Sequence, residues 1–290
     1  MSRLRTLVSL ATALAAIVAA RPAAAFCWAS TCQPNGVVCE VASELNCGLP
    51  LYWPRECIGY SIQRDATSYL SYEDASWAVA TGFNVWLQPF CKDDQVAGIG
   101  LVEMQDVACD QVEYNSSAGN VNLVVFRDEA WTHPDSPDKI AVTTVTFNPE
   151  TGEIYDVDIE INSALHLFTT TETTQAYDLV SIMAHEAGHF FGMGHSLDWD
   201  ATMFELYEPG SVEERTLTLD DQNGMCKMYP PWSIDRAACN PIPRHGFASE
   251  CAANQPAPSC AIRTAGTATS TFGWMTLAAS ILWLRRKRRG

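Results

Sequence analysis

Positive charge is scarce in this sequence. Its 290 residues include 18 Lys and Arg against 34 Asp and Glu, and eight of the basic residues lie in the first 25 or the last six positions. The segment 26–284 keeps 10 Lys and Arg against 34 Asp and Glu, a net charge of −24. A surface this acidic repels polyanions, which excludes nucleic acid and anionic membrane surfaces as partners of this segment.

Redox and zinc-ribbon cysteine motifs are also absent. The chain has 11 cysteines, and no two of them have the Cys-x-x-Cys spacing. In an exported protein such cysteines form disulfides, because the compartment is oxidising. The count is odd, so one thiol is left over, and Cys260 is our candidate for it. Sequence alone does not determine how the other cysteines pair.

Long apolar stretches occur only at the two ends of the chain. Residues 1–25 have a basic start, an apolar run and the small residues Ala23 to Ala25, which together are typical of a secretory signal peptide cleaved before Phe26. A retained signal anchor is the alternative. This pattern predicts export and an oxidising compartment.

The C-terminal end carries a second membrane signal. Residues 265–284 are uncharged, and as a helix they would span about 30 Å, enough for one hydrocarbon core. The basic tail 285–290 follows at once and is expected to stay cytoplasmic. We predict a transmembrane or sorting segment that is the only membrane contact. The layout of cysteine, short span and arginine-rich end resembles the sorting tails of myxobacteria, which implies a cell-surface protein that processing can release.

The part between these ends divides by composition and pattern. Residues 26–52 are rich in cysteine and too short for a core of their own, and residues 233–264 shift to Pro, Ala, Ser and Cys, as in a stalk. The remaining segment, 53–232, is the expected domain. Its patterns predict strands at 53–63, 121–126, 140–147 and 153–162 and helices at 72–87 and 175–191, the second capped by Thr173 or Thr174.

One motif carries the chemistry. The sequence HEAGHFFGMGH begins at His185. On a helix, His185 and His189 lie one turn apart on one face, and Glu186 is placed to reach a metal-bound water without ligating the metal. Gly192 can end the helix, so that the chain turns back and brings His195 to the metal. Three protein ligands leave a fourth position open, as in a catalytic zinc site.

This motif resembles the signature of the metzincin proteases. Ser196 directly after the third histidine, and Met203 a short loop later where a Met-turn is expected, resemble the matrixin branch in particular. Residues 217–229 look like the matrixin C-terminal helix, and residues 60–86 like its first strand and first long helix. The resemblance covers residues 53–230.

The resemblance implies an α+β fold: a twisted mixed β-sheet, an active-site helix and a C-terminal helix. It also implies an exported zinc endopeptidase with one catalytic Zn²⁺, in which Glu186 is the general base for the zinc-bound water. Met203 would form an apolar floor under the metal. A protein or peptide substrate would bind extended along the strand 140–147, the edge of the sheet at the cleft.

The chain departs from related patterns at two positions. Astacins and serralysins have a tyrosine two residues after the Met-turn methionine, and this chain has Glu205 there. Cys47 lies in an echo of the matrixin cysteine switch that lacks its arginine and aspartate. Cys47 is therefore either a latency switch or, by default, half of a disulfide. A second, structural zinc is not expected, because too few histidines remain.

A calcium site is a further hypothesis. Asp156, Asp158 and Glu160 alternate along a predicted strand and therefore share one face. The alternative is an ordinary solvated strand face.

Two other functions compete with the protease hypothesis. One is a catalytically silent surface-binding module that keeps the fold, and the other is a zinc hydrolase acting on a non-peptide bond. The presence of Glu186 argues against the first, and a chelator-sensitive protease assay with casein would separate all three.

Overall fold

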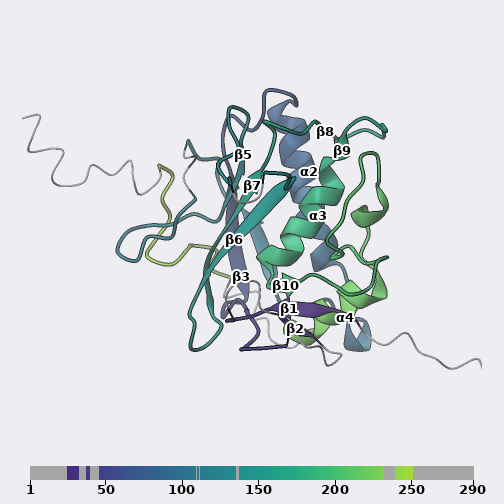
Figure 1. Ribbon diagram of the computed structural model, residues 1–290. Coiled ribbons are helices and arrows are strands. Elements are labelled where there is room, and N and C mark those ends of the chain that lie inside the picture. Colours follow the sequence, from purple (N-terminus) through teal and green to yellow (C-terminus); the bar gives the residue numbers. More distant parts are fainter. Residues whose placement is uncertain are drawn as a thin grey trace, which may run out of the picture.

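The computed structural model centres on a five-stranded mixed β-sheet with two long helices packed side by side against one face (Figure 1). The predicted α+β fold, with a mixed sheet, an active-site helix and a C-terminal helix, is confirmed. The structure describes residues 25–32, 37–39, 46–108, 110, 112–134, 137–231 and 239–250.

Four strands of the sheet are parallel, and the fifth, at the edge, is antiparallel. The strand order is β4 (Gly100–Glu103), β3 (Cys57–Ile62), β5 (Leu123–Phe126), β7 (Ile154–Ile161) and β6 (Ala141–Phe147). A tight turn, in which the N–H of Gly152 donates to the carbonyl of Asn148, joins β6 to β7. Strand β6 therefore has one paired side and one open side.

The helices follow from amphipathic patterns and capping residues. They are α2 (Tyr72–Asn84), which continues as a 3₁₀ turn at Val85–Leu87, α3 (Leu179–Phe190) and α4 (Leu219–Met228). Further 3₁₀ turns lie at Lys92–Asp94 and Glu213–Arg215. Between α2 and α3 the core is aromatic, with Phe83, Trp86, Phe190 and Phe191 all fully buried.

The active-site helix starts later than predicted. The residues just before it form β9 (Tyr177–Asp178), which pairs with β8 (Phe168–Thr169) and therefore cannot be helical. The cap is Asp178, whose carboxylate accepts the N–H of Ser181, and not Thr173 or Thr174.

The first strand of the domain also starts later than predicted, at Cys57 instead of Trp53. Pro54 has no N–H for a strand ladder, and the chain bends there. Trp53 packs into the core, where its indole N–H donates to the carbonyl of Phe190.

The cysteine-rich N-terminal segment joins the domain by strand pairing. Strand β1 (Cys27–Ala29) lies between β2 (Val37–Cys39) and β10 (Met193–Gly194), the short strand after α3. Disulfides Cys27–Cys39 and Cys32–Cys47 stay within this segment, so Cys47 is not a free thiol.

Two longer disulfides hold distant parts of the chain together. Cys57–Cys239 ties the segment after the domain to β3, and Cys91–Cys226 ties the chain after α2 to α4. Cys109, Cys251 and Cys260 lie outside the described residues.

Within the described ranges, no helix combines the length and hydrophobicity that a membrane span requires. The predicted signal sequence, apart from Ala25, and the predicted C-terminal span at 265–284 lie outside these ranges.

The acidic row on β7 is buried, so a solvated strand face was the wrong interpretation of it. Asp156, Asp158 and Glu160 are each at most 2% exposed. They lie on the face opposite the helices, which also carries a second apolar cluster: Val107, Val121, Leu123, Val125 and, partly buried, Val112 and Phe247. Burial raises the pKa of Asp156 to about 7 and the pKa of Asp158 well above its ordinary value.

Stability should therefore depend on pH through Asp156. The folded protein keeps this proton up to about pH 7, whereas the unfolded chain loses it near 3.8. The free energy of unfolding should fall between about pH 4 and pH 7, by at most about 1.4 kcal/mol per pH unit for one proton. Asp156→Asn cannot ionise, so its stability should not fall in this way. The free energy of unfolding of Asp156→Asn minus that of the parent, measured with urea, should therefore be more positive at pH 8 than at pH 5. Asp94→Asn, at an exposed position, is the matched control. A difference between Asp156→Asn and the parent that is the same at both pH values would contradict this expectation.

Candidate metal centre

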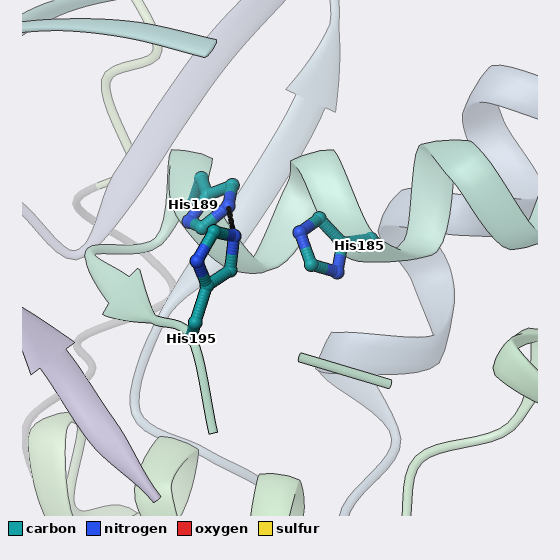
Figure 2. A group of neighbouring side chains, drawn as sticks. All are labelled: His185, His189 and His195. Atoms are coloured by element: carbon teal, nitrogen blue, oxygen red, sulfur yellow. Dashed lines mark hydrogen bonds between the residues drawn. The ribbon is translucent and has the colours of Figure 1, made fainter. Parts of the chain in front are cut away.

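Helix α3 and the turn after it bring the three histidines of the motif together (Figure 2). His185 and His189 project from one face of α3, one turn apart. Helix α3 ends at Phe190, and Gly192 adopts a left-handed backbone with φ of +90°. Strand β10 then returns the chain so that His195 faces the helix.

The imidazole nitrogens converge on one point. One ligand nitrogen from each histidine lies within 4.8 Å of the other two. Nε2 of His189 and Nε2 of His195 are 3.2 Å apart. Two nitrogens on one tetrahedral zinc, at about 2.0–2.1 Å from it, would be separated by about 3.3 Å. The spacing fits one shared zinc ion.

Hydrogen bonds orient two of the rings toward that point. Nδ1 of His185 lies 2.8 Å from the carbonyl of Thr202, and Nδ1 of His189 lies 2.9 Å from the carbonyl of Met193. A carbonyl only accepts, so both Nδ1 atoms carry the proton and both Nε2 atoms present a lone pair. These are the outer partners that the sequence could not identify.

The surroundings of His185 and His195 favour the neutral form of these two rings. Burial, and then the neighbouring histidines, lower the pKa of His185 well below its ordinary value. Burial and the charge of His189 lower the pKa of His195 to about 3. A neutral imidazole is the form that binds metal, so His185 and His195 are in a form that could bind one at neutral pH.

The Met-turn passes directly beneath α3 and is held there by α4. The buried carboxylate of Asp221 accepts the N–H groups of Thr202 and Met203, at 2.9 and 3.1 Å. Met203 is 1% exposed and lies so close to Gly188 that a Cβ there would come within 2.1 Å of its Sδ. Glycine at position 188 is therefore what lets the helix approach this floor.

Glu186 lies next to this centre and is 6% exposed. Its Oε2 accepts a hydrogen bond of 2.5 Å from the hydroxyl of Thr143 on the edge strand β6. Burial raises the pKa of Glu186, and the charge of His189 and the Thr143 hydrogen bond partly offset that effect. A carboxyl with a raised pKa holds a transferred proton more readily than an exposed one.

The segment after the Met-turn forms a side wall. The ring of Tyr207 lies 5.0 Å from that of His185, edge to face. Its hydroxyl is buried and has no hydrogen-bond partner among the described residues. Burial, and then the charge of Glu186, raise the pKa of Tyr207 well above its ordinary value. Glu205, where astacins carry their tyrosine, lies 3.8 Å from Nδ1 of His195.

Sequence reasoning missed Thr143, Tyr207 and Asp221. Thr143 lies in a predicted strand. The alternation of side chains along that strand indicates which face of the sheet Thr143 is on, but nothing in the neighbouring sequence indicates its contact with Glu186. Tyr207 follows the Met-turn methionine by four residues, and its place beside His185 appears only once the chain is folded. The capping pattern of Thr218 and Asp221 was a local signal of a helix start, but not of a contact with the Met-turn.

The three histidines are the one group of metal-ligand side chains close enough to share an ion within the described ranges. In the acidic row of β7, Glu160 is bonded instead to Arg127 and His133. The structure therefore adds no support for calcium at this row.

Comparison with known proteins agrees with the geometry of this centre. The family model described as matrixin matches residues 52–230, more than half of the chain. Metalloendoproteinase 1-MMP of Arabidopsis thaliana is 25% identical over 187 residues, which is 62% of this chain and 44% of that protein. Human neutrophil collagenase is 25% identical over 214 residues, 69% of this chain and 40% of the collagenase. The matches thus span less than half of each relative's length. The match of the family model over residues 52–230 shows that the chain belongs to the matrixin family.

Proposed function

We propose that the protein is an exported zinc-dependent endopeptidase. The observation that carries this proposal is the convergence of three histidine nitrogens beside a buried glutamate. Relatives named metalloendoproteinase and collagenase support the same class of reaction. A silent binding module is less well supported, because a module without catalysis has no need for Glu186 at this place.

His185, His189 and His195 would hold the metal, and Met203 would close the site from below. When bound, zinc lowers the pKa of a coordinated water and polarises the carbonyl of the scissile bond. Glu186 accepts the proton of the attacking water and then delivers it to the leaving amine. Because the carboxyl is almost fully buried, it exchanges this proton with the reactants and not with bulk water.

The open side of β6 is the proposed substrate site. The N–H of Asn162 donates to the carbonyl of Ile140, so alternate residues beginning at Ile140 bond to β7. Ala141, Thr143 and Val145 therefore direct their backbone groups to the open edge. A peptide can add there as a further strand, beside the glutamate that Thr143 contacts.

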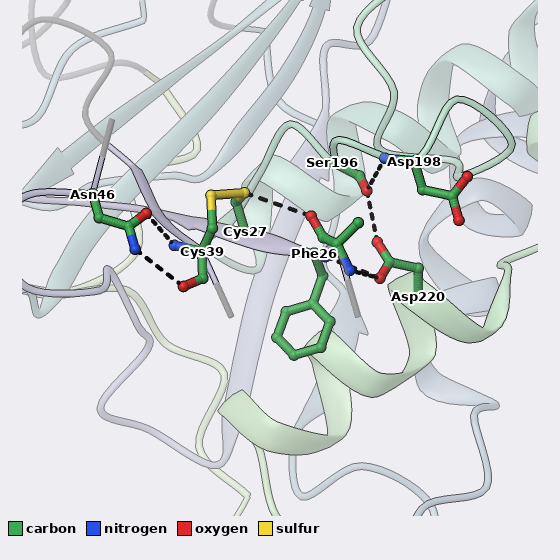
Figure 3. Close-up of a disulfide and its surroundings, with 8 residues drawn as sticks. Phe26, Cys27, Cys39, Asn46, Ser196, Asp198 and Asp220 are labelled. Carbon is green, nitrogen blue, oxygen red and sulfur yellow. Dashed lines mark hydrogen bonds between the residues drawn. A yellow bond between two sulfur atoms is a disulfide. The ribbon is translucent and has the colours of Figure 1, made fainter. Parts of the chain in front are cut away.

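The N-terminal contacts support export with cleavage before Phe26. Figure 3 shows that Asp220 of α4 receives hydrogen bonds from Ser196, the residue after the third histidine, and from the N–H of Phe26. Asp220 is 7% exposed. The N–H of Ala25 donates to the same carboxylate oxygen, at 2.6 Å. Cleavage would remove this donor and turn the Phe26 amide into an ammonium group opposite the carboxylate. The disulfides of the described residues agree with an oxidising compartment.

Removing the general base should separate catalysis from metal binding. Glu186→Ala should bind one zinc per chain but lose peptide hydrolysis by roughly 10² to 10⁴-fold, since a positioned base contributes that much. His195→Ala should instead lose zinc, because it removes one of three ligands. Casein hydrolysis and metal content after dialysis measure the two effects. His245→Ala, away from the site, is the matched control. Full activity of Glu186→Ala would contradict the mechanism.

Substrate binding should depend on the backbone of β6. Val145→Pro removes an N–H that faces the open edge and should raise KM while zinc content stays at one per chain. Val145→Ala controls for the lost side chain and should keep the parent KM. An unchanged KM in Val145→Pro would place the substrate elsewhere.

The Phe26–Asp220 contact predicts a coupling that a double-mutant cycle can measure. A domain that begins at Phe26 should be more stable than one that keeps Ala24 and Ala25, by roughly 1 kcal/mol. One charged donor at Phe26 then replaces the neutral N–H groups of Ala25 and Phe26, and a hydrogen bond between two charged groups is the stronger one. The difference should vanish in Asp220→Asn. Urea unfolding of the four proteins gives the coupling energy, and a value of zero would contradict the ammonium contact.

A further inference from the structure

Position 143 interrupts an apolar row on β6. Ala141, Val145 and Phe147 are partly buried and pack against the main core beneath the helices. Alternate residues of a strand share a face, so Thr143 points to the same side. Its partner across the strands, Ile159, is fully buried in that core. Packing alone would be satisfied by valine, which has the same shape.

The hydroxyl that distinguishes threonine from valine meets the glutamate of the motif. Thr143 Oγ1 lies 2.5 Å from Oε2 of Glu186. An ionised carboxylate only accepts, so the hydroxyl donates. Oε1 of Glu186 has no hydrogen-bond partner among the residues that the structure describes. One carboxylate oxygen is thus held and the other is available.

We propose that Thr143 is a positioning residue for Glu186. Its hydroxyl fixes Oε2 and leaves Oε1 to take the proton from the attacking water. This inference rests on the proposed peptidase function and deepens it. A general base must lie within hydrogen-bond reach of the proton that it removes, and a flexible glutamate side chain meets that need only when its far end is anchored.

The same residue links the base to the substrate. The side chain of Thr143 points to α3, while its backbone N–H and carbonyl face the open edge where the peptide is proposed to bind. A peptide that pairs with β6 would therefore bond to the backbone of Thr143, the same residue whose side chain holds Glu186. The anchor should act on the rate of the bound complex more than on binding.

The test uses the zinc-loaded protein and a fluorogenic peptide substrate. Thr143→Val keeps the shape and removes the hydroxyl, and it should lower kcat by roughly 10- to 100-fold, the range expected for a lost hydrogen bond to a charged group. KM should stay within about twofold of the parent, since the backbone is unchanged. Zinc content should remain one per chain.

Thr144→Val is the matched control. It makes the same chemical change one residue further along β6, where the side chain is exposed and points to the other face. It should keep the kcat and KM of the parent. A Thr143→Val protein that behaves like Thr144→Val would overturn the inference.

Thr143→Ser and Thr143→Ala test the hydroxyl if valine disturbs folding. They differ by one oxygen, and the serine variant should have at least about tenfold higher kcat. Equal kcat values, or a difference confined to KM, would also overturn the inference.

Glu186→Ala and the parent keep the two proposals apart. An active parent, an inactive Glu186→Ala and an unaffected Thr143→Val would reject only the role of Thr143. A parent that cleaves no peptide, or a fully active Glu186→Ala, would reject the peptidase proposal, and the role of Thr143 with it.

Discussion

The metal centre depends on one buried carboxylate, that of Asp221 in α4. It holds the N–H groups of Thr202 and Met203, which fixes the Met-turn under α3. The carbonyl of Thr202 in turn orients His185. Gly188 completes the arrangement, because only a residue without a side chain lets the helix rest on Met203. The orientation of His185 therefore depends on a residue 36 positions further along the chain.

The neighbouring carboxylate, that of Asp220, holds the segment that carries His195. It binds the hydroxyl of Ser196, directly after the third ligand, and the backbone of Phe26 in the N-terminal segment. Helix α4 thus links the N-terminal segment to the segment around the metal centre. The disulfide Cys91–Cys226 also ties α4 to the chain after α2. Several distant segments of the chain therefore meet at one short helix beside the metal centre.

Local patterns predicted much of this architecture, and contacts between distant segments were beyond them. Helical spacing is enough to place His185 and His189 on one face. The cap of α3 was misplaced because threonine and aspartate are both good caps. The β8–β9 pairing keeps the backbone extended through Asp178, so the helix begins only after that residue. Alternation put Asp156 on one face of β7, but it contains no information on whether other segments cover that face. Thr143 was missed for the same reason.

The most direct measurement of the central claim is X-ray absorption at the zinc edge, on the purified protein loaded with one equivalent of zinc. Coordination by His185, His189 and His195 with an open fourth position predicts three imidazole nitrogens and one oxygen, at about 2.0–2.1 Å. His195→Ala should reduce the imidazole count to two in whatever zinc remains bound. A sulfur scatterer near about 2.3 Å, or four protein ligands, would contradict a catalytic zinc at this centre.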